Sequence, residues 1–181
     1  MVTAIAHEDD LKIMFIGDAS CGKTCLLLGY MLQDFKVQNP QPTTYDTKLK
    51  RYSKNINGVA EQRRALITDT CGMNDVASLT PTSIRKQHGF IIVFDLTRKE
   101  TLTGAIDRIK DLKEEKGQNV VCVLAGNKSD DTNLRQVQKH EAEAVAKANN
   151  IPYYETSART GDNVNEMMMY LQDKADLAKA S

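Results

Sequence analysis

The sequence predicts an α/β fold with a mostly parallel sheet and one antiparallel edge strand, and three features of its 181 residues lead to this prediction. Short apolar runs recur along the chain, amphipathic stretches lie between them, and one Asn-Gly dipeptide joins two extended segments. Apolar runs without polar alternation are typical of parallel strands that are buried on both faces. Strands of this kind that alternate with helices indicate the α/β class.

Five apolar runs, rich in Ile and Val, are the candidate parallel strands. They are Ile13 to Ile16, Leu66 and Ile67 before Thr68, Phe90 to Phe94, Val120 to Leu124, and Ile151 to Tyr154. Two segments flank Asn57-Gly58, a dipeptide that tolerates positive φ at both central positions of a hairpin turn: Asp46 to Ser53, and Glu61 to Thr68, which contains the Leu66-Ile67 run. These two segments are therefore predicted to be antiparallel.

The intervening helices are predicted from apolar residues at three-to-four-residue spacing, because this spacing lays one stripe on a helix. Two such stripes are Leu102, Ile106, Ile109 and Leu112, and then Val164, Met168, Leu171 and Ala175. A further amphipathic segment runs from Cys25 to Leu32. The three methionines at 167–169 are interpreted as core filling, because Met packs irregular gaps well.

Length and composition fit a single domain, because 181 residues with 41% hydrophobic side chains can bury one full core. We expect residues 1–10 to form an amino-terminal extension and residues 11–181 to form the domain. Lys and Arg together number 24, as do Asp and Glu together. Net charge therefore gives no reason to expect a nucleic-acid or anionic-membrane partner.

The amino terminus, MVTAIAHEDD, lacks a positively charged start followed by a long apolar run, and Val2 excludes a myristoylation signal. A cytoplasmic protein is expected. The cysteines Cys21, Cys25, Cys71 and Cys122 form neither CxxC pairs nor a Cys/His cluster. Because cytosolic thiols stay reduced, we expect free, buried thiols, no disulfide and no structural metal.

The segment GDASCGKT follows the first predicted strand and matches the phosphate-loop pattern G-x-x-x-x-G-K-[ST], with Gly17, Gly22, Lys23 and Thr24 in the defining positions. Glycines let the loop backbone curl so that its N–H groups point at phosphate oxygens, and the helix beginning near Thr24 adds its positive dipole end. Lys23 is expected to reach the β and γ phosphates, and Thr24 to bind Mg²⁺ through its hydroxyl. This pattern alone does not separate ATP users from GTP users.

Base selection is predicted from NKSD, which follows the predicted strand at Val120 to Leu124 and contains Asn127, Lys128 and Asp130. A carboxylate at Asp130 accepts from the two donors on the guanine edge, N1–H and the exocyclic amine, whereas adenine presents an acceptor there. A second loop, Glu155 to Arg159, follows the last strand and can offer backbone N–H groups to the guanine oxygen. A guanine nucleotide is therefore the predicted ligand.

Taken in order, GDASCGKT, Thr43, DTCG, NKSD and ETSA resemble the Ras superfamily of small GTPases across nearly the whole chain. The resemblance implies a P-loop GTPase G domain, with a six-stranded sheet surrounded by five helices. From Asn127 through RQV to ETSARTGDNVNEM, the sequence is most similar to the Rab branch. The first loop, GDASCGKTCLLL, is closer to Rho, but the Rho-type insertion after NKxD is missing. A Rab-like or unclassified Ras-like protein is therefore favoured.

The resemblance also implies roles for individual positions. Phe35 stands where the family stacks an aromatic ring on guanine, although a core aromatic at a helix end is the alternative. Thr43 is expected to bind Mg²⁺ and sense the γ-phosphate, with the neighbouring Thr44 as the alternative. Asp69 is expected to hold Mg²⁺ through water, and Gly72 to donate its N–H to the γ-phosphate. The remaining predicted nucleotide contacts are Gly17, Ala19, Ser20, Cys21, Gly22, Cys25, Asn127, Lys128, Ser157, Ala158 and Arg159.

The sequence departs from the family where hydrolysis is controlled. The family usually continues DxxG with Gln, whose amide orients the attacking water, but Met73 follows DTCG here. A thioether has no donor and is a weak acceptor, so it cannot hold that water. Ala19 and Ser20 also add side-chain atoms where many relatives have Gly. We therefore expect slow intrinsic hydrolysis, with the amide of Asn74 as the alternative water-positioning group. The predicted catalytic positions are Lys23, Gly72 and Met73, the last in place of Gln.

The carboxyl terminus departs from the family as well. Membrane-acting relatives generally end in prenylated cysteines, whereas this sequence ends KADLAKAS and its last cysteine is Cys122. A chain cut before a tail, a G domain within a longer protein and a natural soluble GTPase are the three interpretations. Membrane association is therefore expected only through a tail or domain that is not in this chain.

The leading interpretation is a GTP/GDP switch in vesicle trafficking or signalling. GTP would tether the loops around Thr43 and Gly72 through the γ-phosphate, and loss of that phosphate would release them. The expected partners are nucleotide exchange factors, GTPase activators and effectors. A non-catalytic scaffold that holds nucleotide permanently is the alternative, and Met73 favours it. A P-loop kinase is disfavoured by NKSD and by the lack of an evident arginine-rich lid.

Overall fold

The computed structural model describes residues 7–35, 45–56, 58–70 and 80–180. Its strands are β1 Leu11–Gly17, β2 Tyr45–Ile56, β3 Val59–Thr70, β4 Gly89–Asp95, β5 Cys122–Asn127 and β6 Tyr153–Glu155. Its helices are α1 Lys23–Leu32, α2 Pro81–Arg85, α3 Glu100–Lys116, α4 Lys139–Asn149 and α5 Val164–Lys179, with a 3-10 turn, η1, at Thr132–Leu134. Within these described ranges, no helix is both long and apolar enough to cross a membrane.

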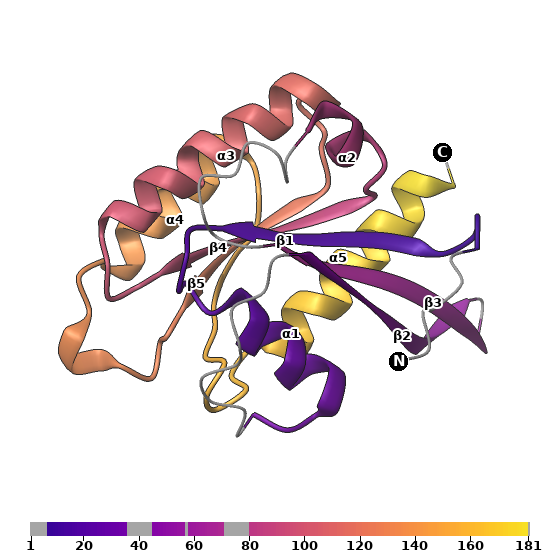
Figure 1. The fold of residues 1–181 in the computed structure, drawn as a ribbon, viewed down its shortest axis with the longest axis horizontal. Coiled ribbons are helices and arrows are strands. Elements are labelled where there is room, and N and C mark those ends of the chain that lie inside the picture. Colours follow the sequence, from indigo (N-terminus) through magenta and orange to yellow (C-terminus); the bar gives the residue numbers. More distant parts are fainter. Residues whose placement is uncertain (1–6, 36–44, 57, 71–79, 181) are drawn as a thin grey trace.

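The strands form one six-stranded sheet in the order β2-β3-β1-β4-β5-β6 (Figure 1). β1 pairs in parallel with β3 and β4, and the β4–β5 and β5–β6 pairs are also parallel. β2 lies at one edge of the sheet and is antiparallel to β3. The predicted α/β class, with a mostly parallel sheet and one antiparallel edge strand, is confirmed.

The central strand β1 separates two layers of apolar side chains. Leu11, Ile13 and Phe15 pack with residues of α1 and α5, whereas Met14 and Ile16 pack with residues of α2, α3 and α4. Figure 1 shows the same division, with α1 and α5 on one side of the sheet and α2, α3 and α4 on the other. Because both faces of β1 are covered, its sequence is continuously apolar from Ile13 to Ile16.

The β2–β3 hairpin turns where the sequence predicts. The two strands pair without interruption from Tyr45 with Thr70 to Ile56 with Val59, which leaves a two-residue turn. Gly58 in this turn has φ 85°, a conformation that glycine adopts without steric cost. Both strands are longer than the predicted 46–53 and 61–68, because cross-strand pairing continues beyond these limits in both directions.

Other predicted boundaries need small corrections. β5 begins at Cys122, after Val120 and Val121, and β6 is limited to Tyr153–Glu155, so Ile151 precedes it. In α3, Ile106 is 40% exposed and Ala105 is buried, so the predicted stripe was wrong at that position. Ala105, three residues after Leu102, takes the buried position between Leu102 and Ile109. The predicted stripe of α5 is buried throughout, as are Met167 and Met168, whereas Met169 is 63% exposed.

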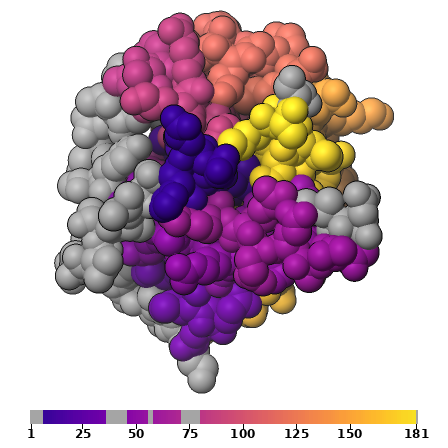
Figure 2. Space-filling model, turned by 90° about the vertical axis from the view of Figure 1, so that its right-hand side faces the viewer, coloured from indigo at the N-terminus to yellow at the C-terminus, as the bar shows by residue number. Residues whose placement is uncertain are grey.

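The hairpin is fastened to α5 at the end of the sheet remote from the strand carboxyl ends. Tyr52 and Lys54 of β2 each donate to Oδ2 of Asp176 at 3.1 Å. Near the carboxyl end of α5, Lys179 donates to the carbonyl of Glu8 at 3.1 Å. Figure 2 shows this face, on which the indigo start of the described chain, the magenta hairpin and the yellow end of α5 adjoin. The opposite end of the sheet carries the candidate site.

Candidate nucleotide-binding site

The phosphate loop connects β1 to α1 and contains two glycines whose conformation and surroundings exclude a side chain. Gly17 has φ 147°, and a Cβ on it would lie 2.1 Å from the carbonyl oxygen of Val93 in β4. Gly22 has φ 88°, and a Cβ there would lie 2.3 Å from Nδ2 of Asn127. The loop therefore lies directly against the ends of β4 and β5, at the strand carboxyl ends where open α/β sheets bind ligands.

The Lys23 ammonium group lies inside this loop. Lys23 is the first residue of α1 and is 5% exposed. Its Nζ donates to the carbonyls of Gly17 at 3.0 Å and Asp18 at 2.9 Å. Burial lowers the pKa of Lys23, and nearby Cys21 and Asp69 partly offset this effect. A cation held inside the loop by these two carbonyls is positioned to meet phosphate oxygens.

Two oxygen ligands suited to Mg²⁺ meet beside the loop. Thr24 lies in the first turn of α1 and Asp69 lies near the end of β3, where it pairs in register with Phe15. The hydroxyl of Thr24 donates to Oδ2 of Asp69 at 2.5 Å. Mg²⁺ typically takes one or two protein oxygens and completes its shell with water and substrate phosphates, so this pair fits the ion. Within the described ranges, no group of three or more His, Cys, Asp or Glu side chains forms a metal cluster.

Asn127, at the end of β5, joins the phosphate loop to the loop that follows β6. This second loop, Glu155 to Arg159, is called the ETSA loop after its first four residues. Its Nδ2 donates to the carbonyl of Cys21 at 2.8 Å, and its Oδ1 accepts from the backbone N–H of Ala158 at 3.1 Å. Asn127 is 1% exposed, and its bond to Cys21 is buried. The phosphate loop and the predicted base loops are therefore parts of one connected site.

The carboxylate of Asp130 is oriented by the ETSA loop. Ser157 donates from Oγ to Oδ1 of Asp130 at 2.6 Å, and the same Oγ accepts from the backbone N–H groups of Arg159 at 3.1 Å and Thr160 at 3.0 Å. The guanidinium of Arg159 lies 3.8 Å from Oδ2 of Asp130. A carboxylate held in this way can accept two parallel hydrogen bonds from the guanine edge without first reorganising.

The arrangement of phosphate loop, Mg²⁺ ligands and base loops coincides with a family match. A sequence model of the Ras family matches residues 12–176, nearly the whole chain. The chain belongs to the Ras family. Ras-family proteins are small GTPases that bind GTP or GDP with Mg²⁺ and work with regulators and effectors, so the coarse prediction from the sequence is confirmed.

Phe35 of this Ras-family protein packs between two glycines. A Cβ on Gly29 of α1 would lie 2.4 Å from its Cδ1, and a Cβ on Gly161 would lie 2.6 Å from its Cδ2. The ring is partly buried and packs against the core layer of α1 and α5. Phe35 is therefore placed beside the ETSA loop, while its predicted stacking on guanine stays a prediction.

Lys128 has a partner that the sequence did not predict. It adopts φ 68° and its Nζ lies 2.7 Å from Oδ2 of Asp95, at the end of β4. Burial alone would raise the pKa of Asp95, but hydrogen bonds from Lys128, Thr97 and Arg98 outweigh it and hold that pKa below its usual value. The sequence signal that could have found this contact is an Asp directly after the apolar run Phe90 to Phe94, which places it at the carboxyl end of a predicted parallel strand, as NKSD is.

Several other predicted positions can be placed and some cannot. Ala19 and Ser20 are exposed at the outer turn of the loop, and Ser20 has φ 61°. Cys25 is half-buried, which corrects the expectation of a buried thiol. The following predicted residues lie outside the described ones: Thr43, Thr44, Gly72, Met73 and Asn74.

Proposed function

We propose that this Ras-family protein is a guanine-nucleotide switch whose intrinsic GTP hydrolysis is slow. The observation that carries the proposal is the position of Asn127, which is bonded to the phosphate loop through Cys21 and to the ETSA loop through Ala158. A ligand that spans these loops must present phosphates at one end and a base at the other. The carboxylate of Asp130 supplies the preference for guanine.

The chain's own groups divide the work of binding. The loop amides and Lys23 hold the phosphates, Thr24 and Asp69 hold the metal, and Asp130 holds the base. When bound, Mg²⁺ neutralises charge on the β and γ phosphates. Hydrolysis further requires a group that orients water, and Met73 has no donor for that purpose. Slow turnover is therefore expected even though nucleotide is held well.

Nucleotide competition tests the binding part of the proposal. We expect fluorescent mant-GDP to bind the unaltered protein and to be displaced by GDP in preference to ADP. Inosine diphosphate lacks the exocyclic amine, so it should compete less well than GDP. In Asp130→Ala the charge-assisted pair is lost, GDP affinity should fall by about ten- to a hundredfold, and the preference for GDP over inosine diphosphate should disappear. Equal competition by ADP and GDP in the unaltered protein would contradict the proposal.

Single-turnover hydrolysis tests the kinetic part. The protein is loaded with GTP, and phosphate release is followed after addition of Mg²⁺. The Met73→Gln variant should hydrolyse GTP faster than the unaltered protein, because the amide can orient water. If Met73→Gln brings no acceleration, a different feature limits the reaction and the assignment to Met73 is wrong.

A permanent nucleotide-binding scaffold is the second candidate, and Met73 is the observation that favours it. Hydrogen exchange separates the two candidates, since a switch must differ between its GDP-bound form and its form bound to a non-hydrolysable GTP analogue. Identical exchange in both forms would favour the scaffold.

Similarity of the carboxyl-terminal half to the Rab branch supports vesicle traffic as the setting, with a cytoplasmic location between membrane encounters.

A further inference from the structure

Arg98, between β4 and α3, contacts both the phosphate loop and a buried carboxylate. Its Nε donates to Oδ2 of Asp95 at 3.0 Å, and its guanidinium NH2 donates to the carbonyl of Ala19 at 2.8 Å. The same nitrogen lies 3.6 Å from Sγ of Cys21. One planar side chain therefore connects two loops that are 79 residues apart in sequence.

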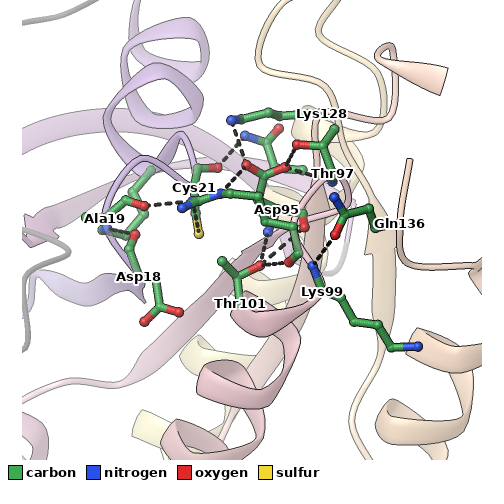
Figure 3. A network of polar contacts seen from close by, with 12 residues as sticks. Asp18, Ala19, Cys21, Asp95, Thr97, Lys99, Thr101, Lys128 and Gln136 are labelled. Carbon is green, nitrogen blue, oxygen red and sulfur yellow. Dashed lines mark hydrogen bonds and ion pairs between the residues drawn. The ribbon is translucent and has the colours of Figure 1, made fainter. Parts of the chain in front are cut away.

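Asp95 connects Arg98 to the guanine motif. Its side chain is fully buried, and besides Arg98 it accepts from Nζ of Lys128 at 2.7 Å and from the N–H and hydroxyl of Thr97 at 2.9 and 2.7 Å. Its own backbone N–H donates to Oγ1 of Thr101 at 2.9 Å, which fixes it to α3. Figure 3 shows Ala19 and Cys21 to the left of Asp95 and Lys128 above its carboxylate. The buried carboxylate thus links the phosphate loop to NKSD.

The contact with Ala19 controls the direction of a loop amide. The carbonyl of Ala19 and the N–H of Ser20 belong to one planar trans peptide, so they point in opposite directions. A donor that holds the carbonyl from outside the loop directs the N–H of Ser20 inward, where phosphate binds. The carbonyl of Cys21 is held in the same way by Asn127 at 2.8 Å, which directs the N–H of Gly22.

We propose that Arg98 is a positioning residue for the nucleotide phosphates, acting through the Ala19–Ser20 peptide. This inference rests on the proposed binding of guanine nucleotide. The fork geometry is required, because Asp95 and the Ala19 carbonyl are bonded by different nitrogens of one guanidinium. A lysine can pair with the carboxylate as a point charge but lacks the second donor at a fixed angle.

Release of mant-GDP tests the proposal, in the unaltered protein, Arg98→Met and Arg98→Lys. Arg98→Met keeps the length of the side chain and removes every donor. It should release mant-GDP about tenfold faster, as expected for loss of a charge-assisted bond to a partly exposed group. Arg98→Lys should fall between the two. Arg85→Met is the matched control, because Arg85 pairs with Glu115 at 3.0 Å away from the loop and should leave release unchanged.

The readout separates positioning from folding. Dissociation is measured on loaded molecules, so a variant that merely folds less completely gives a smaller amplitude at the same rate. The Ser20 amide should also shift on GDP addition in a ¹⁵N spectrum of the unaltered protein and shift less in Arg98→Met. Release from Arg98→Met within about twofold of the unaltered rate overturns the inference alone, since a lost charge-assisted bond predicts more. Failure of the unaltered protein to bind mant-GDP overturns both this inference and the proposed function.

Discussion

Replacing Gly29 by alanine tests how Phe35 is seated, because two opposite effects meet at this position. Gly29 lies inside α1, where glycine costs about 1 kcal/mol of helix stability relative to alanine. Its backbone is helical, so no positive φ requires glycine. What excludes a side chain is Phe35, whose Cδ1 and Cε1 would lie 2.4 and 2.6 Å from a Cβ at this position. An alanine can therefore enter only if the ring moves.

The magnitudes predict that Gly29→Ala stabilises the protein only when Phe35 is absent. With Phe35 present, Gly29→Ala gains about 1 kcal/mol of helix propensity and loses a similar or larger amount, about 1–2 kcal/mol, as the half-buried ring is displaced. The net free energy of unfolding should stay unchanged or fall. In the Phe35→Ala background the ring is gone, so Gly29→Ala should raise the free energy of unfolding by about 1 kcal/mol.

The coupling between Gly29 and Phe35 is measured by urea denaturation of four proteins: the unaltered protein, Gly29→Ala, Phe35→Ala and the double variant. Nucleotide is left out so that ligand affinity does not contribute. Gly161 also touches Phe35, but its φ of 87° strains any side chain there and makes it unsuitable as the matched site. An equal gain of about 1 kcal/mol from Gly29→Ala in both backgrounds would show that Phe35 does not pack on Gly29.

Three further predictions concern groups outside the loops. Burial and nearby lysines lower the pKa of His88 below 6.5, and its Nδ1 accepts from the backbone N–H of Lys12 at 2.9 Å. The unfolded chain protonates this histidine more readily than the folded protein does. The stabilisation from neutral His88 should therefore be complete above pH 6.5 and be lost as pH falls through the lowered pKa. Urea denaturation at a series of pH values should show this loss, and the free energy of unfolding should fall less steeply in His88→Asn. Burial raises the pKa of Cys122 to about 11, so mass spectrometry should find it unalkylated by iodoacetamide at pH 8 until the protein is denatured. Arg64→Met should destabilise the protein by about 2 kcal/mol in urea, because Asp10 is 1% exposed and its carboxylate pairs with Arg64 at 2.9 Å.

The sequence predicted those parts of the fold that depend on neighbouring residues. The phosphate loop and the Asn57-Gly58 turn are local, since glycine positions and strand context decide their backbone conformation. The layered sheet was predictable because β4 and the other buried strands contain apolar runs without polar alternation. β6 was harder, because its three residues are all only partly buried and its limits depend on pairing with β5.

The contacts that hold the site together could not be read from spacing. Asp95 and Arg98 are three residues apart, a spacing that by itself indicates a surface ion pair. Their contacts with Ala19 and Lys128 arise because parallel strands bring their carboxyl ends to one edge of the sheet. The roles of NKSD were predicted from base chemistry, but the bond from Asn127 to Cys21 required the arrangement of β1 and β5 in space.

The proposed positioning of the phosphate loop by Arg98 and the proposed slow hydrolysis together affect how the protein would be regulated. The fraction of molecules bound to GTP depends on the rates of nucleotide release and hydrolysis together. Under these proposals, Arg98 and Asn127 would hold the loop from outside and slow release, whereas Met73 would slow hydrolysis, so the residues would act on different steps. A protein slow in both steps changes state only when partners accelerate them. Measuring nucleotide release and GTP hydrolysis on the unaltered protein therefore tests whether both steps depend on partners. Rapid release without any partner would remove the need for an exchange factor and leave hydrolysis as the single controlled step.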